Sequence, residues 1–448
     1  MIETRNGTLF FDGCDTTRLA QKYGTPLYVY SQTAIEARFA ELRRDFIERW
    51  PGARVAYAAK SFFCLGMARL VAQAGMCLDV VSGGELRTAL AAGFPAERIE
   101  FNGNNKLLDE LELAVENGVG RIIVDGAHEL EDIEAICRAK GRRMKVLYRV
   151  TPGVKADSHD YIVTGKKDSK FGFPLDEDVI YPAVEAAIRS PYVDFLGFHF
   201  HIGSQLFECE PYKQATGAVL ELVRQVKDRY GVGVQELNLG GGFGITYTTE
   251  ERRPYRYYLD PMMEQVAACF DEMGLPRPAL VVEPGRSIAG DAAITLYTIG
   301  SIKEVKGVRK YLSTDGKEVV GSRKYVSVDG GMTDNIRPAL YQAVYRGILA
   351  NKAGQPPEET VTVCGKCCES GDIIMKDAEL PRAERGDLLA VFSTGAYGYT
   401  MASNYNSIPV PAVVLVRNGR DECMVRRQTW EDVTACQLIP DTLKGDER

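Results

Sequence analysis

Short apolar runs alternate with longer segments of helical spacing through residues 33–290. The runs that predict strands number eight and span residues 53–59, 77–81, 98–102, 121–124, 145–150, 194–201, 236–239 and 279–282. Between them, segments such as 83–92 and 109–118 carry apolar residues at helical spacing. This alternation predicts an α/β fold with a parallel sheet and helices outside it. Eight units in roughly 250 residues favour a (β/α)8 TIM-like barrel, although an open doubly wound sheet also accommodates eight strands.

The pattern changes after residue 290, where strand-like runs follow one another with turn residues between them. These runs span residues 292–302, 325–328, 359–363, 387–392 and 410–416. They predict a second, mostly antiparallel β domain. Two runs near the N-terminus, 8–11 and 26–30, also predict strands, and we expect them to pair with this domain. The expected domains are therefore a barrel over residues 33–290 and a β domain over 1–32 plus 291–448. The polar segment 309–324 predicts an exposed hairpin or loop.

Composition narrows the class of protein. The chain has 448 residues, of which 45% are hydrophobic and 26% charged, as in ordinary globular proteins. Its net charge of −7 argues against nucleic acid or an anionic membrane as the main partner. The first residues show no basic region followed by an apolar run, so we expect no secretory signal. Glycines, asparagines and two prolines interrupt the uncharged stretch 388–416, so we expect no membrane helix there. Eleven scattered cysteines, an odd number, fit reduced thiols, so we expect a cytoplasmic protein.

Polar residues at the ends of the first two barrel strands are the first candidates for chemistry. Lys60 closes an apolar strand, and partial desolvation favours its neutral, nucleophilic amine; the alternative is a lysine on the barrel rim. Asp79 lies inside the next apolar strand and needs a partner, for which Lys60 is a candidate. Ser82 and Glu85 have the spacing of a capping box.

The sixth strand carries two of the four histidines, His199 and His201, which alternation places on one strand face. They form either a metal pair or a site where an imidazole packs against a planar ligand. Nearby residues offer no evident third metal ligand, which favours the planar ligand.

Glycines and charges follow strands seven and eight, where barrels often bind phosphate. Gly240-Gly241-Gly242 lets backbone N–H groups approach an anion, or is only a tight turn. Glu283-Pro284-Gly285-Arg286 adds a close N–H group and a cation, while Glu283 suits a positive group on the ligand. A phosphate, a planar face, a protonatable ring nitrogen and an aldehyde for Lys60 together describe pyridoxal phosphate.

Further clusters lie in the C-terminal half. Arg337 and Tyr341 lie near a turn, and residues 395–406 form either an ordinary loop or a ligand wall. The cysteines at 364, 367 and 368 contain one C-x-x-C motif, but a zinc site needs a second pair of ligands at a suitable spacing, and none is present. Cys368 beside Glu369 instead suits an exposed proton donor next to a carboxylate that binds the ligand. The segment 166–172 is more simply a solvated loop than a lid.

Five motifs occur in the order found in the diaminopimelate decarboxylase family, which the chain resembles over nearly its whole length. This family belongs to the barrel-type pyridoxal-phosphate enzymes, together with ornithine decarboxylase and alanine racemase. The motifs are Tyr57-Ala-Ala-Lys60, His199-Phe-His-Ile-Gly-Ser-Gln205, Gly240-Gly-Gly242, Glu283-Pro-Gly-Arg286 and Cys368-Glu-Ser-Gly-Asp372. One departure is Gly365-Lys366-Cys367 where the family often has Gly-Pro, which leaves open which cysteine faces the site.

The resemblance implies a role for each matching residue. Lys60 holds the cofactor aldehyde covalently, His201 stacks on the ring with His199 as the alternative, and Glu283 pairs with the ring nitrogen. The remaining cofactor-binding residues are Asp79, Ser204, Gly240, Gly241, Gly242, Pro284, Gly285, Arg286 and Tyr397. Those implied for the distal end of the substrate are Arg286, Arg337, Tyr341, Glu369 and Tyr397. Cys368 is the proton donor, and in the family it and Glu369 come from the other subunit of a homodimer.

The implied activity is decarboxylation of meso-2,6-diaminopimelate to L-lysine. The nearest alternative is a related decarboxylase acting on ornithine, lysine, arginine or carboxynorspermidine. A racemase would have no obvious use for Cys368 and Glu369. A catalytically dead homologue that regulates a partner enzyme would have lost Lys60 or Cys368, and both are present.

Overall fold

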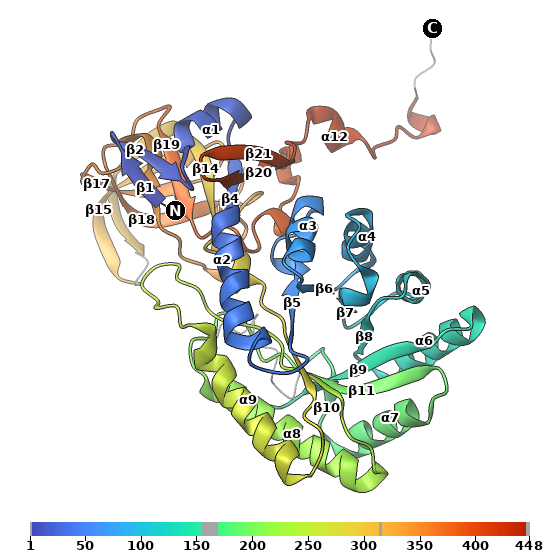
Figure 1. Cartoon of the computed structure of the whole chain (residues 1–448). Helices are drawn as coiled ribbons and strands as arrows, with labels where there is room; N and C mark the ends of the chain where they lie inside the picture. Colours follow the sequence, from blue (N-terminus) through green and yellow to red (C-terminus); the bar gives the residue numbers. More distant parts are fainter. Residues whose placement is uncertain (1, 155–168, 313–315, 445–448) are drawn as a thin grey trace. The chain divides into compact units, whose positions relative to one another are not determined.

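The computed structural model describes residues 2–154, 169–312 and 316–444. The chain divides into two compact units. The barrel unit spans Ala34–Ala292, and the β unit combines Met1–Thr33 with Ala293–Arg448. Figure 1 traces both units along the chain.

The barrel unit contains a closed ring of parallel strands. In chain order these are β5 (Arg54–Ala58), β6 (Cys77–Val80), β7 (Ile99–Phe101), β8 (Arg121–Val124), β9 (Met144–Thr151), β11 (Val193–His199), β12 (Glu236–Asn238) and β13 (Ala279–Val282). Each pairs in parallel with the next, β8 pairs with β9, and β13 pairs with β5 to close the ring. The short strand β10 (Phe173–Pro174) adds to β9. The predicted barrel, with all eight of its strands, is confirmed, and the open sheet is excluded.

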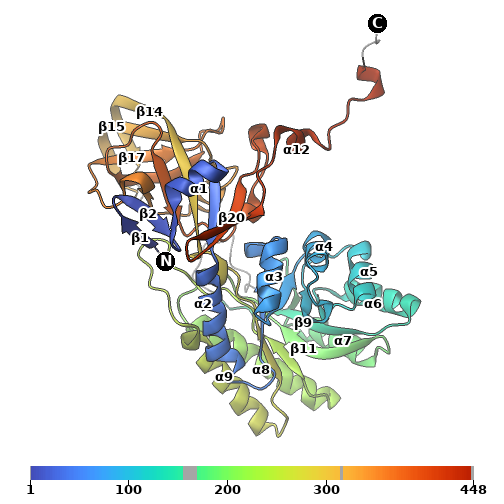
Figure 2. The ribbon, with the colours of Figure 1, turned by 45° about the horizontal axis from the view of Figure 1, so that its top comes forward.

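Helices follow the strands and lie outside the ring (Figure 2). They are α2 (Gln32–Leu42), α3 (Leu65–Gln73), α4 (Gly83–Ala91), α5 (Leu108–Asn117), α6 (Ala127–Lys140), α7 (Glu177–Arg189), α8 (Glu210–Tyr230), α9 (Tyr255–Glu272) and the short α10 (Arg286–Ala289). Their apolar faces are buried: α8, for example, buries Val219, Val223 and Val226 at helical spacing. Ser82 caps α4 by accepting a hydrogen bond from the Glu85 amide at 3.2 Å, as predicted. The reciprocal bond differs, because the Glu85 carboxylate accepts from the amide of Val81.

The β unit is built on one large sheet. Its strands are β4 (Leu27–Ser31), β14 (Ala293–Leu312), β15 (Glu318–Val328), β16 (Gly347–Leu349), β17 (Glu359–Cys364), β18 (Ile373–Leu380), β19 (Leu388–Phe392), β20 (Ala412–Arg417) and β21 (Arg420–Val425). Most pairings are antiparallel, as predicted, while β15–β17 and β4–β20 are parallel. The helices of this unit are α1 (Thr16–Tyr23), α11 (Arg337–Tyr341) and α12 (Trp430–Thr434).

The two N-terminal runs behave differently. The run at 26–30 becomes β4, which pairs with β14 and β20, so its predicted pairing is confirmed. The run at 8–11 becomes β2 (Thr8–Phe11), which pairs with β1 (Ile2–Arg5) and β3 (Cys14–Asp15) in a separate sheet. β2 therefore forms no strand pairing with the C-terminal domain, contrary to the expectation, although Leu9 and Phe11 pack in one core with Ile294 and Leu296 of that domain. Asn6-Gly7 and Asp12-Gly13 adopt positive φ angles that favour tight hairpins, so β2 pairs with its immediate neighbours.

Residues 309–312 and 318–324 lie at the end of the antiparallel β14–β15 ribbon, which bears out the predicted hairpin. Tyr311 pairs with Val319 and Leu312 with Glu318, while residues 313–315 lie outside the described part of the chain.

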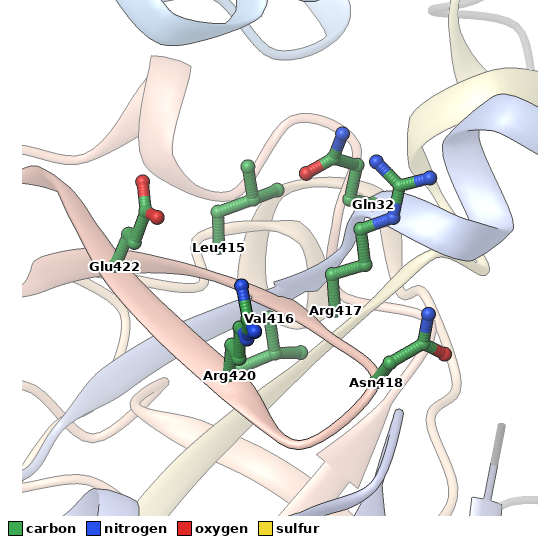
Figure 3. A pocket seen from close by; sticks show the side chains of 7 residues that line it. All are labelled: Gln32, Leu415, Val416, Arg417, Asn418, Arg420 and Glu422. Carbon is green, nitrogen blue, oxygen red and sulfur yellow. The ribbon is translucent and has the colours of Figure 1, made fainter.

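The β unit also has a pocket of about 550 Å³ beside the β20–β21 hairpin. Figure 3 shows its lining: Gln32, Leu415, Val416, Arg417, Asn418, Arg420 and Glu422. None of these belongs to the predicted site. Among the described helices, none is long and apolar enough to cross a bilayer.

Candidate active site

Lys60 and Asp79 lie at the carboxyl ends of neighbouring barrel strands. Lys60 is in the 3₁₀ turn η2 (Ala59–Ser61) that follows β5, and Asp79 is in β6 opposite Ala58. Asp79 is buried, and its hydrogen-bond partner is the Asn102 amide at 2.9 Å. The expected partner, Lys60, acts on Asp79 through its positive charge, which lowers the pKa of that carboxyl. Burial and the neighbouring Glu283 outweigh this effect and raise the pKa to about 7.

Glu283, directly after β13, accepts three side-chain hydrogen bonds. Its carboxylate accepts from Asn102 at 3.1 Å, from Asn238 at 2.8 Å and from His199 Nε2 at 3.1 Å. Burial alone would raise the pKa of Glu283, but His199 and the Lys60 ammonium lower it to about 2. Glu283 is therefore an ionised carboxylate in a buried site, which suits a protonated ring nitrogen.

The two histidines of strand β11 have different environments, because the strand ends at His199 and His201 lies beyond it. His199 is buried inside the barrel against Glu283. His201 accepts a hydrogen bond from the Gly241 amide through Nδ1 at 3.2 Å. Burial, Lys60 and Arg149 lower the pKa of His201 well below its usual value, so its ring is neutral. A neutral imidazole with one nitrogen already bonded can pack its face against an aromatic ligand.

The glycine loop after β12 and the turn after β13 pack closely together. A side chain at Gly241 would lie 2.0 Å from the carbonyl oxygen of Glu283, and one at Gly285 would lie 2.9 Å from Ala58 Cβ. Gly240 and Gly242 have φ angles of 68° and 104°, which other residues rarely adopt. Glycine is therefore required here for close approach and for backbone conformation.

Arg286 and Ser204 come together beside this loop although 82 residues separate them. The Arg286 guanidinium donates to Ser204 Oγ at 3.0 Å and to the Tyr247 hydroxyl at 2.7 Å. Arg286 is buried, and the bonds fix its planar fork. Tyr247 was not predicted, because no motif marks it.

This residue set fits pyridoxal phosphate. Within the described residues, the backbone N–H groups of Gly242 and Gly285 donate to no acceptor, although Gly285 is buried. Buried donors without partners suit an anion, and Arg286 supplies a neighbouring cation. Glu283 supplies the anion for a ring nitrogen, and Lys60 supplies the amine for an aldehyde.

A second layer of charges lies deeper in the barrel, at the amino ends of the strands. Arg121 contacts Glu100 at 3.2 Å and Glu236 at 3.0 Å, and Arg54 also pairs with Glu236. Asn238 donates to Glu100 at 2.8 Å and so links this layer to Glu283. Sequence reasoning missed the layer, although charged residues in short apolar strands were a usable signal.

The other predicted residues lie in the β unit, on the short helix α11 and on two loops: Arg337, Tyr341, Cys368, Glu369 and Tyr397. The Lys366 amide donates to the carbonyl of Gly330, and the Ser403 amide to that of Thr333, both at 2.9 Å. The Cys368 amide donates to Asn406 Oδ1 at 2.8 Å. Hydrogen bonds thus join the segments that carry these residues.

Arg337 and Tyr397 have constrained settings in the β unit. Arg337 is buried and donates to the Tyr345 hydroxyl at 2.6 Å, and Tyr341 is half-buried on the same short helix. Tyr397 has a φ of 59°, a strained conformation for a tyrosine. The Tyr30 hydroxyl bonds the carbonyl of Gly395 at 2.7 Å and so holds this loop.

Asp372 fixes the orientation of the Cys367-Cys368-Glu369 segment. Its carboxylate accepts from the amides of Met332 at 2.7 Å and Cys367 at 2.9 Å. Cys367 is buried as a result, whereas Cys368 and Glu369 are exposed. Of the two cysteines that the sequence left open, Cys368 is thus the accessible thiol.

Metal ligation was an alternative for the histidine pair and for the cysteine cluster. Across residues 2–154, 169–312 and 316–444, no group of three or more His, Cys, Asp or Glu side chains is arranged to hold a metal ion. The predicted loop or lid at 166–172 lies partly outside the described residues, which resume at 169.

Comparison with known proteins identifies the family. The model of the pyridoxal-binding domain of pyridoxal-dependent decarboxylases matches residues 32–290. Diaminopimelate decarboxylase of Bacillus subtilis is 47% identical over 437 residues, which cover 97% of this chain and 96% of that protein. The chain belongs to the diaminopimelate decarboxylase family. The resemblance drawn from the five ordered motifs is confirmed, and the chain is a pyridoxal-phosphate-dependent decarboxylase.

Solved structures of the diaminopimelate decarboxylase family share this fold. The enzyme from M. jannaschii in co-complex with L-lysine superposes with a TM-score of 0.90 at 34% identity, covering 99% of both chains. A lysine/ornithine decarboxylase from Vibrio vulnificus, complexed with putrescine, has a TM-score of 0.74 at 21% identity and covers 90% of this chain and 97% of that chain. The latter similarity shows the shared fold alone.

Proposed function

We propose that this enzyme decarboxylates meso-2,6-diaminopimelate to L-lysine and carbon dioxide, a step of lysine biosynthesis. The observation that carries the proposal is the buried, ionised Glu283 beside Lys60 at the carboxyl end of a closed barrel. The names of relatives at 46–48% identity over nearly the whole chain support the same substrate.

In the barrel unit, Lys60 is the amine that carries pyridoxal phosphate, which when bound supplies the electron sink for loss of the substrate carboxylate. Glu283 keeps the ring nitrogen protonated. The neutral ring of His201 would pack against the cofactor ring, and Asp79 would border the site through its bond to Asn102. Ser204, the three glycines at 240–242, Pro284, Gly285 and Arg286 would surround the phosphate, and the family resemblance assigns Tyr397 of the β unit to the same ligand.

Cys368 is the proton donor in this proposal. Its thiol is exposed, and its backbone is held by Asn406. After the carboxylate leaves, Cys368 returns a proton to the α-carbon. Its neighbour Glu369 places a carboxylate within one residue of this donor, where it binds the distal ammonium group of the substrate.

Recognition of a second carboxylate distinguishes this substrate from simple diamino acids. Arg286 and Arg337 hold the distal carboxylate, and Tyr341 and Tyr397 contribute hydroxyl groups. A site built to pair all of these charges leaves some unpaired when ornithine or lysine binds. Such mismatches are worth roughly 10⁴–10⁵ in discrimination when the unpaired groups are buried. A decarboxylase of a simple diamino acid remains the alternative.

Measurement of released carbon dioxide tests this proposal. The purified enzyme with pyridoxal phosphate is given meso-diaminopimelate, ornithine, lysine or arginine in parallel. We expect rapid release from meso-diaminopimelate and release lower by several powers of ten from the others. Equal or faster release from a simple diamino acid would overturn the assignment of the substrate.

We further propose a homodimer with shared active sites. The support is the family resemblance, in which the residues matching Cys368 and Glu369 come from the other subunit, together with the exposure of both side chains here. We also propose that the enzyme works in the cytoplasm, since all eleven cysteines are free thiols.

A further inference from the structure

Asn238, the last residue of β12, uses its whole side chain for hydrogen bonds at the centre of the barrel. Its amide nitrogen donates to Glu283 and to Glu100, each at 2.8 Å. Its amide oxygen accepts from the backbone N–H of Gly240 at 2.9 Å. The residue is fully buried, so water does not compete for these bonds.

Two of the three side-chain hydrogen bonds of Asn238 reach different ends of the cofactor site. Glu283 serves the ring nitrogen, and Gly240 begins the loop that serves the phosphate. The link is closed through the backbone, because the Glu283 amide donates to the Gly240 carbonyl at 2.8 Å. Gly240 is therefore held on both sides, and its φ of 68° is kept in place.

The chemistry of an amide is required at this position. Two carboxylates, Glu283 and Glu100, converge on Asn238, and each takes a hydrogen of its –NH2 group. An aspartate here would offer no N–H donor to either carboxyl group and would repel the ionised Glu283. Glu100 is itself held in place, because Arg121 of the charged layer at the amino ends of the strands contacts it at 3.2 Å.

We propose that Asn238 is a positioning residue that couples the phosphate-binding loop to the Glu283 carboxylate. Both ends of the cofactor are thereby bound by one rigid unit. This inference rests on the proposed function, in which the loop at 240–242 holds the phosphate.

Asn102 provides a matched control within the same site. It also donates to Glu283, at 3.1 Å, but its other bond goes to Asp79 and none reaches the glycine loop. Its amide oxygen has no partner among the described residues. Asn102→Ala therefore removes one hydrogen bond to Glu283 and none to the glycine loop. Asn238→Ala removes a hydrogen bond to Glu283 and the one to the loop.

The experiment compares the dissociation constants of pyridoxal phosphate and pyridoxal for the apoenzyme by fluorescence titration. The ratio of the two constants measures the contribution of the phosphate. We expect Asn238→Ala to lower this ratio about tenfold, the effect of losing one hydrogen bond that positions the loop, and Asn102→Ala to leave it unchanged. Both variants should bind pyridoxal about tenfold more weakly than wild type.

A third variant separates the two contacts of Asn238 by a change of chemistry at the same side-chain size. Asn238→Asp keeps the oxygen that accepts from Gly240 and removes the donors to Glu283. It should bind pyridoxal at least tenfold more weakly and keep the wild-type ratio. Unchanged pyridoxal binding in Asn238→Asp would overturn the inference.

Failure of the inference and failure of the proposed function give different results. An unchanged ratio in Asn238→Ala, with a wild-type enzyme that prefers pyridoxal phosphate, removes the coupling role of Asn238 alone. A wild-type enzyme that binds both ligands equally removes the phosphate-binding role of the loop, and the proposed function with it.

Discussion

His199 lies 3.1 Å from the carboxylate of Glu283 through its Nε2 atom, and both side chains are buried in the barrel. Among the causes that lower the pKa of Glu283, this contact with His199 is the largest, although burial opposes it. His199→Phe keeps a planar aromatic ring of slightly larger size and removes the donor. We expect pyridoxal phosphate to bind roughly tenfold more weakly, since a hydrogen bond to a charged group is worth about 1.5–3 kcal/mol.

Equilibrium binding to the apoenzyme measures this effect. His128 lies on α6 with a side chain that is 97% exposed, so His128→Phe is the control and should bind the cofactor as wild type does. If His199→Phe binds with unchanged affinity, the contact does not control the ionisation of Glu283.

Lys60→Ala removes the amine that follows β5 and should abolish activity. Borohydride treatment of the loaded wild-type enzyme should leave a stable cofactor adduct on Lys60, found by mass spectrometry of a digest. The variant should give no such adduct. Lys213→Ala, at a partly exposed lysine of α8, is the control and should retain it. An adduct on another lysine of the wild-type enzyme would contradict the assignment.

Asp79 should make the stability of the apoenzyme depend on pH. Its folded pKa of about 7 is above its ordinary value of 3.8, so the folded state binds the proton more tightly than the unfolded state. The free energy of unfolding therefore falls as pH rises from about 4 to about 7. Asp79→Asn imitates the protonated acid and removes this contribution.

Thermal unfolding at pH 5 and pH 8 checks the sign. From pH 5 to pH 8, the Tm of the wild-type protein should fall by about 2–6 °C more than the Tm of Asp79→Asn falls. Other groups, such as His201, titrate equally in both proteins and cancel in the difference. A parallel pH dependence of the two proteins would show that Asp79 is ionised throughout.

Cys368→Ala should reduce decarboxylation about 10²–10⁴-fold, the usual contribution of a general acid, and leave cofactor binding intact. Cys423, which is exposed on β21, offers a control, and Cys423→Ala should keep full activity. The same assay on Cys367→Ala tests the alternative cysteine. If Cys367→Ala loses turnover and Cys368→Ala does not, Cys367 and not Cys368 is the proton donor.

The homodimer with shared sites predicts complementation. Lys60→Ala and Cys368→Ala proteins are each inactive, but a mixed dimer has one site with both residues intact. Random exchange of subunits should therefore restore about a quarter of wild-type activity per site, because half of the dimers carry one complete site of two. No recovery despite exchange proven by mass spectrometry would argue for sites within one chain.

Much of this protein was determined by the sequence alone. The barrel strands are parallel and buried on both faces, so they appear as continuous apolar runs, and all eight were found. The motif residues Lys60 and Glu283 follow such runs directly, and the ends of parallel strands converge at one end of a barrel. Local chemistry also predicted the Ser82 cap, which needs only residues three positions apart.

The tertiary structure alone decided how these residues are paired. Asn102 and Asn238, which hold Glu283, lie 181 and 45 residues from it and belong to no motif. Periodicity placed His199 and His201 on one strand face, but β11 ends at His199. As a result His199 contacts Glu283, whereas His201 accepts a hydrogen bond from Gly241. Sequence patterns report local periodicity and exposure, whereas hydrogen bonds inside a closed barrel depend on which distant strands face each other across it.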